Sequence, residues 1–210
     1  MASLIAMAGI ESVISSFAVE RIAPAIGRGD LILIGGLARL GKSTLASAIA
    51  ETISAFDLSA IVVSLDSWIL PANERVMPGV ENRFDIQSAL STLAPWLGPR
   101  LPLRCKLPEY DRQMRTRRLE AVDLDLAADA VLILEGVPAL LLPISTERAV
   151  HRIYVQGDEA GRRDRVISDL LARGIQSREL AERIYQERQI DETPHIEGSA
   201  IRADYFLRLD

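Results

Sequence analysis

The 210-residue sequence is poor in cysteine, histidine and lysine. Its one cysteine, Cys105, excludes an internal disulfide, and only two histidines, His151 and His195, are present to join a zinc-type cluster. Of the 24 basic residues only Lys42 and Lys106 are lysine, so the other 22 are arginine. Because lysine is so rare, the position of each lysine carries information.

Long apolar runs and a surplus of positive charge are also missing. No run approaches the roughly 18 uncharged residues of a membrane span, so we expect no membrane partner. The apolar first ten residues lack a basic start and are interrupted by Glu11, which argues against a signal peptide. The net charge of −5 argues against general binding of nucleic acid. A cytoplasmic protein is the simplest expectation.

The composition fits one globular domain over residues 1–210, with 49% hydrophobic and 25% charged residues. Helical spacing of apolar residues predicts an N-terminal helix and linker within 1–29. Short apolar runs follow at 31–34, 60–65, 130–134 and, more weakly, 152–155. They lack alternation and are separated by helical patterns, which is typical of a parallel sheet buried on both faces.

Residues 95–118 form a basic segment. Four prolines between 95 and 108 prevent a continuous helix, so we predict an irregular excursion from the sheet. Between residues 100 and 118, seven basic residues face two acidic ones, a local charge of +5. This segment is the exception to the acidic average of the chain.

Residues 36–43 read G-L-A-R-L-G-K-S and fit the phosphate-loop pattern G-x-x-x-x-G-K-[ST] between a strand and a helix. From this composition, the pattern arises by chance in roughly one such chain in a thousand. Backbone N–H groups of the loop and the helix N-terminus suit the phosphates of ATP. Lys42 would neutralise the β- and γ-phosphates, and the Ser43 hydroxyl would bind Mg²⁺. The predicted nucleotide-binding residues are Gly36, Leu37, Ala38, Arg39, Leu40, Gly41, Lys42, Ser43 and Thr44.

Missing motifs and the short chain disfavour several classes of phosphate-loop protein. The two asparagines, Asn73 and Asn82, do not begin an N-K-x-D motif, which disfavours a Ras-like GTPase, and larger ATPases need more chain. A compact kinase for a small hydroxyl acceptor remains.

Two carboxylates end predicted strands, where open α/β sheets place ligand groups. Asp66 suits a base that accepts the proton of the acceptor hydroxyl, or a cap of the next segment. Glu135 follows four apolar residues. Its carboxylate could bind Mg²⁺ directly or through water, or it is an ordinary turn residue before Gly136.

With these residues in place, the chain resembles the uridine kinase, phosphoribulokinase and pantothenate kinase group of P-loop kinases. The resemblance extends over nearly the whole chain. V-S-L-D-S-W at 63–68 is similar to the family segment that ends strand two, and L-I-L-E-G at 132–136 to its V-I-x-E-G strand. The resemblance implies a three-layer, doubly wound α/β sheet of the P-loop NTPase type with a small helical lid at 158–190. It also implies ATP and Mg²⁺ as cofactors and Asp66 as the catalytic base.

The resemblance implies further site residues. R-F-D at 83–85 resembles the family's N-F-D segment, which makes Asp85 and Arg83 candidates for binding acceptor hydroxyls. P-E-Y-D at 108–111 with T-R at 116–117 adds Tyr110 and Arg117, and the lid motif at 165–174 implies that Arg165 and Arg173 close over the phosphates.

Departures from the family bear on the acceptor. Arg112 and Arg115 stand where uridine kinases carry an aromatic residue and a histidine, and Ser168 replaces one lid arginine. Two guanidiniums suit a phosphate or carboxylate on the acceptor, or they are solvated loop residues. Arg39 either reaches over the nucleotide or faces solvent.

The sequence thus predicts an ATP-dependent kinase of a nucleoside or of a sugar-like or anionic metabolite. The alternative is a non-catalytic ATP-binding module with a regulatory or assembly role. Phosphorylation of a nucleic acid end is weaker, because the basic segment has no interleaved aromatics apart from Tyr110. Homo-oligomerisation stays open.

Overall fold

A computed structural model describes residues 2–98 and 101–209, so Pro99 and Arg100 of the basic segment lie outside the described residues. The main sheet has five strands in the order β2-β5-β1-β6-β7, all parallel. The strands are β1 (Leu31–Gly35), β2 (Ala60–Ser64), β5 (Val131–Glu135), β6 (Val150–Gly157) and β7 (Tyr205–Leu209). The four predicted strands are confirmed, and β7 is an addition.

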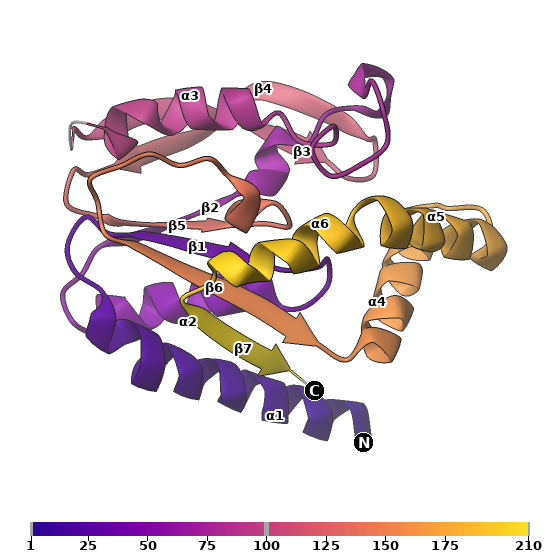
Figure 1. The fold of residues 1–210 in the computed structure, drawn as a ribbon, viewed down its shortest axis with the longest axis horizontal. Helices are drawn as coiled ribbons and strands as arrows, with labels where there is room; N and C mark the ends of the chain where they lie inside the picture. The colour runs from indigo at the N-terminus through magenta and orange to yellow at the C-terminus, as the bar shows by residue number, and fades with distance from the viewer. Residues whose placement is uncertain (1, 99–100, 210) are drawn as a thin grey trace.

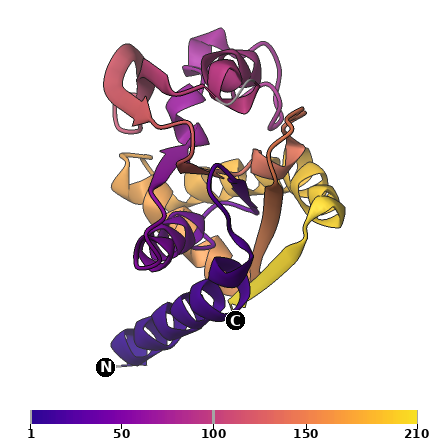
Figure 2. The same ribbon diagram turned by 90° about the vertical axis from the view of Figure 1, so that its left-hand side faces the viewer.

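Helices cover both faces of this sheet (Figures 1 and 2). α1 (Ala2–Phe17) and α2 (Lys42–Ser54) lie on one face, and α6 (Thr193–Gly198) crosses the other. α1 continues into a π-helical turn at Ala18–Ile22. The 3₁₀ turns are Ala23–Ala25, Leu65–Trp68, Ala72–Glu74, Ala139–Leu141 and Ser199–Arg202. The predicted doubly wound α/β fold is confirmed.

The centre of the sheet forms the core of the molecule. Every residue of β1 and β5 is buried, because these strands lie between two neighbours and under helices on both faces. β2 is an edge strand, and its Val62 is 38% exposed. The continuous apolar runs therefore marked the central strands most clearly, as expected for a sheet covered on both sides.

Within its described residues the basic segment is mostly regular, so the prediction of an irregular segment is wrong. α3 (Ile86–Leu97) passes through Pro95, and β3 (Leu103–Asp111) pairs antiparallel with β4 (Thr116–Leu126) in a separate two-stranded sheet. α3 forms because its apolar face, including Trp96, is buried. Pro108 sits where the register shifts between Leu107 and Glu109, a bulge that needs no N–H from proline. Figure 1 shows this unit beyond the β2 edge of the main sheet.

A buried arginine fastens α3 to the main sheet. Arg148 Nε donates to the Trp96 carbonyl at 2.8 Å, and its Nη1 donates to the carbonyls of Gly29 at 2.8 Å and Ala128 at 3.1 Å. The guanidinium carbon lies 3.5 Å from the centre of the Trp96 ring. One side chain thus joins the helix to the loops at the amino-terminal edge of the sheet.

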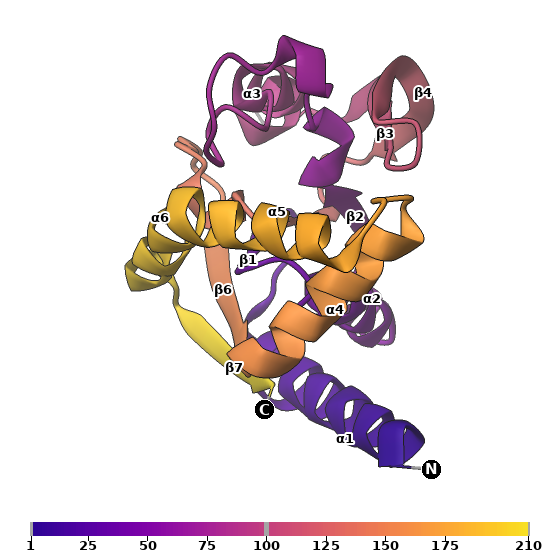
Figure 3. The same cartoon turned by 90° about the vertical axis from the view of Figure 1, so that its right-hand side faces the viewer.

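The predicted helical region after β6 consists of α4 (Glu159–Ala172) and α5 (Arg178–Asp191). The break falls at Gly174, whose φ of +87° favours glycine. The two helices share a small apolar cluster of their own, which includes Val166, Leu170 and Tyr185. Figure 3 shows α5 crossing in front of the carboxyl ends of the strands, below α3 and the β3–β4 hairpin.

The first turn of α4 is capped by Asp158, whose carboxylate accepts N–H bonds from Ala160 at 3.2 Å and from Gly161. We expect Asp158→Ala to lower the free energy of unfolding by about 1 kcal/mol, the usual value of an N-cap. Urea denaturation measures this. Asp164→Ala, an exposed change on the same helix, is the control and should stay within about 0.5 kcal/mol of the parent. Equal losses in the two variants would contradict the capping role.

Candidate functional site

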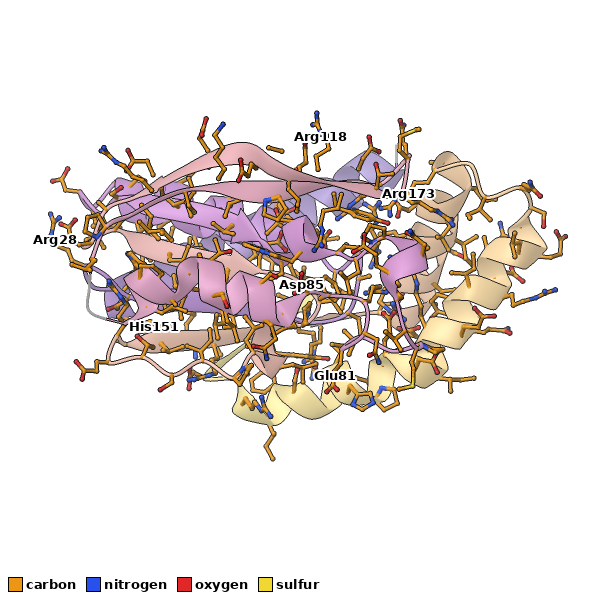
Figure 4. All side chains as sticks on the ribbon, turned by 90° about the horizontal axis from the view of Figure 1, so that it is seen from above. Arg28, Glu81, Asp85, Arg118, His151 and Arg173 are labelled. Atoms are coloured by element: carbon orange, nitrogen blue, oxygen red, sulfur yellow. The ribbon has the colours of Figure 1, made fainter. Side chains whose placement is uncertain are left out.

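The candidate residues gather at the carboxyl edge of the main sheet, the position at which open α/β sheets bind ligands. Glu135 at the end of β5 is in register with Ile34 of β1 and Ser64 of β2. In Figure 4, Arg28 and His151 lie toward one end of the view and Arg173 toward the other. Arg28 and His151 precede or begin strands, so Arg173 marks the carboxyl edge.

The phosphate loop has the backbone that its glycines require. Gly36 has a φ of +132°, and a Cβ at this position would lie 2.3 Å from the Val155 carbonyl oxygen. Gly41, which precedes α2, has a φ of +78°, and Arg39 between them also has a positive φ of 64°. This left-handed geometry lets successive N–H groups face one side, which suits a phosphate chain.

Lys42 stands at the start of α2 and is only 7% exposed. Its Nζ donates to the Leu37 carbonyl at 2.7 Å. Burial lowers the pKa of Lys42 from 10.5 to about 8, although nearby Glu135 opposes the shift. The charges of three arginines, at positions 162, 112 and 83, lower this pKa further. The loop thus holds a buried ammonium that an anion would stabilise.

Two oxygen-bearing side chains fit magnesium. Glu135 is buried at the end of β5, and Ser43 is exposed in the first turn of α2. A carboxylate and a hydroxyl are the hard ligands that Mg²⁺ takes alongside phosphate and water oxygens. Within residues 2–98 and 101–209, no group of three or more His, Cys, Asp or Glu could hold a metal by itself. Glu135 and Ser43 would thus supply two of the ligands of a magnesium ion, and phosphate and water oxygens would supply the others.

Asp66 follows β2 in a 3₁₀ turn. The turn is capped by the Ser64 hydroxyl, which accepts the Asp66 N–H at 3.3 Å, so Asp66 is not the cap. The Asp66 carboxylate forms an ion pair with Arg112 of the β3–β4 hairpin, and its side chain is 26% exposed. This pair joins the tip of the hairpin to the turn that follows β2.

Asp85 is the N-cap of α3, where it accepts the Ser88 N–H at 3.1 Å. Arg117 donates to its other oxygen at 3.1 Å and also lies 3.5 Å from Glu74. Burial raises the pKa of Asp85, but the hydrogen bonds from Ser88 and Arg117 outweigh it, and the pKa lies below its usual value. This aspartate is therefore a carboxylate with much of its hydrogen-bonding capacity in use.

The two arginines of the basic segment lie in different settings. Arg112 contacts Asp66, whereas Arg115 is exposed in the turn between β3 and β4, with a φ of 55°. Tyr110 precedes them on β3 and lies beside Arg75. The structure therefore brings Arg112 to the predicted base and leaves Arg115 at the hairpin tip.

The predicted lid arginines tie the lid to the phosphate loop. Arg165 Nε donates to the Arg39 carbonyl at 3.1 Å. Arg39 and Arg173 both form ion pairs with Asp169 of α4. The Arg39 side chain therefore does not simply face solvent. Its ion pair with Asp169 joins the phosphate loop to α4.

Two arginines beside the phosphate loop, Arg162 and Arg188, were missed in the sequence analysis. A cavity beside the phosphate loop is lined by Leu37, Ala38, Val137, Arg162, Val166, Tyr185, Arg188, Gln189, Glu192 and Thr193. Glu192, after α5, forms an ion pair with Arg83, so the end of α5 contacts the segment before α3. Arg188 looked like one charge among many on a helix with both signs interleaved, and no pattern distinguished it.

Neither a protein-family model nor a curated protein matches this chain. Solved structures do. A putative fructose transport system kinase from Silicibacter sp. TM1040 matches with a TM-score of 0.67 and 21% identity, over 92% of this chain and 98% of that one. A possible uridine kinase from Bacillus stearothermophilus matches with a TM-score of 0.57 and 21% identity, over 93% and 97% of the two chains.

A D-glycerate 3-kinase from Cryptococcus neoformans matches more distantly, with a TM-score of 0.52 and 12% identity, over 84% of this chain and 83% of that one. At these identities the matches establish the fold. The resemblance that the motifs indicated is confirmed at this level: the chain has the α/β fold of the P-loop kinases.

Proposed function

We propose that this protein is an ATP-dependent kinase that transfers the γ-phosphoryl group to a hydroxyl of a small molecule. The observation that carries the proposal is Lys42, a buried ammonium in a phosphate loop, within reach of the charge of Glu135 and at the same sheet edge as Asp66. Binding of a triphosphate would place negative charge next to this ammonium and stabilise it.

The chain's own residues divide the work of phosphoryl transfer. The loop N–H groups and Lys42 hold the β- and γ-phosphates, and Asp66 orients the acceptor hydroxyl and accepts its proton. Arg165 and Arg173, on or just after α4, exclude water and place positive charge over the phosphates when the lid closes. Magnesium, held by Ser43 and Glu135, would neutralise charge on the phosphate oxygens.

The acceptor is the less defined partner. The solved structures are described as a putative fructose transport system kinase, a possible uridine kinase and a D-glycerate 3-kinase, and these names mention a sugar, a nucleoside and an acid. Asp85 and Arg83 lie between β2 and α3, and Tyr110 and Arg117 lie on the β3–β4 hairpin, which contacts this segment through the bond from Arg117 to Asp85. We propose that these four residues line the acceptor site.

The test is acceptor-dependent release of ADP. The protein, ATP and magnesium are incubated with fructose, uridine, glycerate or fructose 6-phosphate, and ADP is measured in a coupled assay. We expect at least one acceptor to raise ADP release well above the rate with water alone. Nucleotide binding with the same slow rate for every acceptor would contradict the kinase.

One observation favours a second candidate, the non-catalytic ATP-binding module. Asp66 is paired with Arg112, so the predicted base is occupied by a guanidinium in this conformation. In a kinase, the acceptor displaces this arginine; in a binding module, the pair persists. Turnover that is equally slow in the parent and in Asp66→Asn under every acceptor would favour the module.

A further inference from the structure

Arg188 lies half-buried on α5 and faces other arginines. Burial lowers its pKa to about 10, and the charge of Arg83 contributes next. Arg173 and Arg75 act in the same direction, whereas Glu192 opposes them. Among the described residues, Arg188 forms no hydrogen bond and no ion pair. Its charge therefore interacts with three guanidiniums and one nearby carboxylate.

The carboxylates beside Arg188 and its neighbour Arg173 already form ion pairs. Glu192 forms its ion pair with Arg83, and Asp169 is shared by Arg39 and Arg173. Two cations on one carboxylate leave a net positive charge at this point of the lid. The cluster of arginines is therefore not neutralised by the acidic residues beside it.

Two neighbouring arginines have hydrogen-bonding capacity that no carboxylate uses. The Arg75 guanidinium donates twice to a neutral partner, the Leu70 carbonyl, at 2.9 and 2.8 Å. Arg83 Nε is buried and has no hydrogen-bond partner among the described residues. Buried donors without an acceptor are costly, so a ligand that supplies acceptor oxygens would be stabilised here.

The position of the cluster decides what such a ligand is. Arg188 lines a cavity with Leu37 and Ala38 of the phosphate loop and Val137 after β5. Arg75 and Arg83, by contrast, come from the segment between β2 and α3, on the acceptor side of Asp66. Arg188 therefore lies between the phosphate loop and the segment that carries Arg75 and Arg83, which is part of the proposed acceptor site.

We propose that Arg188, together with Arg83 and Arg75, binds an anionic group of the acceptor, so that the acceptor is a hydroxyl compound carrying a carboxylate or a phosphate. The proposal rests on the proposed kinase function and names the class of its acceptor. Guanidiniums bind both groups through paired hydrogen bonds, which explains the preference for arginine over lysine here. The selectivity is assigned to α5 and the segment after β2, rather than to Arg115 at the hairpin tip.

The experiment compares acceptors that differ by one anionic group. The pairs are glycerol with glycerate, fructose with fructose 6-phosphate, and uridine with uridine 5′-monophosphate. Binding is measured by calorimetry and thermal shift in the presence of magnesium and a saturating non-hydrolysable ATP analogue, which occupies the phosphate loop. We expect at least one anionic member to bind more tightly than its neutral partner. Arg188→Gln should weaken that binding about 10- to 100-fold.

Arg183→Gln is the matched control, because Arg183 is an exposed arginine on the same helix. It should leave anion binding unchanged, and the ATP analogue should shift the melting temperature of both variants as it does the parent. Arg188→Lys, which keeps the charge without the planar fork, should give an intermediate affinity. Because Arg188→Lys is a smaller change than Arg188→Gln, it tests anion binding by Arg188 even where the glutamine variant disturbs folding.

Three results would overturn the proposal: neutral members bind as well as anionic ones, Arg188→Gln binds the anions as the parent does, or this variant weakens the ATP analogue instead. The last result would assign Arg188 to the γ-phosphate. Kinetics separate this proposal from the kinase itself. An acceptor KM raised at unchanged kcat supports anion binding by Arg188. Arginine-dependent anion binding without any phosphoryl transfer would leave the site standing and refute the kinase.

Discussion

Asp66→Asn should lower kcat for the preferred acceptor by about two to four orders of magnitude, the range of general-base catalysis. The amide keeps the shape of the side chain and can orient a hydroxyl, but it cannot accept the proton. Because Asp66 lies outside the phosphate loop, the affinity for ATP should stay close to that of the parent. ADP release and a nucleotide titration measure the two quantities on the same preparation.

Asp57→Asn is the control for this substitution. Asp57 lies before β2, is exposed, and has a φ of 57°, a conformation that asparagine adopts readily. It should change turnover by less than about twofold, since surface changes away from the site have small effects. If Asp66→Asn retained the turnover of the control, another group would have to accept the proton, and the assignment of Asp66 would be wrong.

In the reaction proposed above, the ion pair between Asp66 and Arg112 would give the hairpin a role. An acceptor hydroxyl that reaches Asp66 must replace the guanidinium, which then becomes free to meet the incoming phosphate oxygens. The side chain of Arg112 is 44% exposed, so it has room to move away from the carboxylate. The local charge of +5 noted in the sequence therefore includes one arginine, Arg112, that is paired with Asp66 and one, Arg115, that is exposed at the hairpin tip.

The parts of the fold that the sequence predicted are those with a strong local signal. Continuous apolar runs mark strands between two neighbours, and the loop pattern marks the turn into α2. β3 and β4 were missed because a two-stranded sheet with one exposed face gives no continuous apolar run, and Pro108 at its bulge resembled a loop signal. β7 alternates along an edge and carries Phe206, 53% exposed, which weakened its pattern.

The site divides along the same line. The phosphate loop and the two carboxylates at strand ends could be placed from spacing alone, because the strands fix them at one sheet edge. The cluster around Arg188 could not, because it joins α5 to segments about one hundred residues earlier, and the identity of each ion-pair partner depends on packing. Asp85 shows the same limit, since its role as a helix cap appears only with Ser88 and Arg117 in place.

Lys42→Met should lower kcat strongly and, at neutral pH, stabilise the protein without ligands. Loss of one charged group aimed at the transferred phosphates lowers kcat by about 10²- to 10³-fold. In the free protein the buried ammonium is unfavourable, because burial lowers its pKa from 10.5 to about 8. That difference corresponds to about 3 kcal/mol, and losing the bond to the Leu37 carbonyl removes about 1 kcal/mol of the gain. We therefore expect a net gain of about 2 kcal/mol in the free energy of unfolding.

The pH dependence gives the sharper measurement. Below pH 8 Lys42 carries its proton in both the folded and the unfolded chain, so the parent bears the full penalty. Between about pH 8 and pH 10.5 the unfolded chain binds more protons at this group, so the parent gains stability as the pH rises and the advantage of Lys42→Met disappears. Urea denaturation of both proteins at pH 7 and pH 9.5 measures the change. Lys106→Met, at an exposed lysine, is the control. If the difference in unfolding free energy between the parent and Lys42→Met stayed constant across this range, burial of the Lys42 ammonium would not destabilise the free protein.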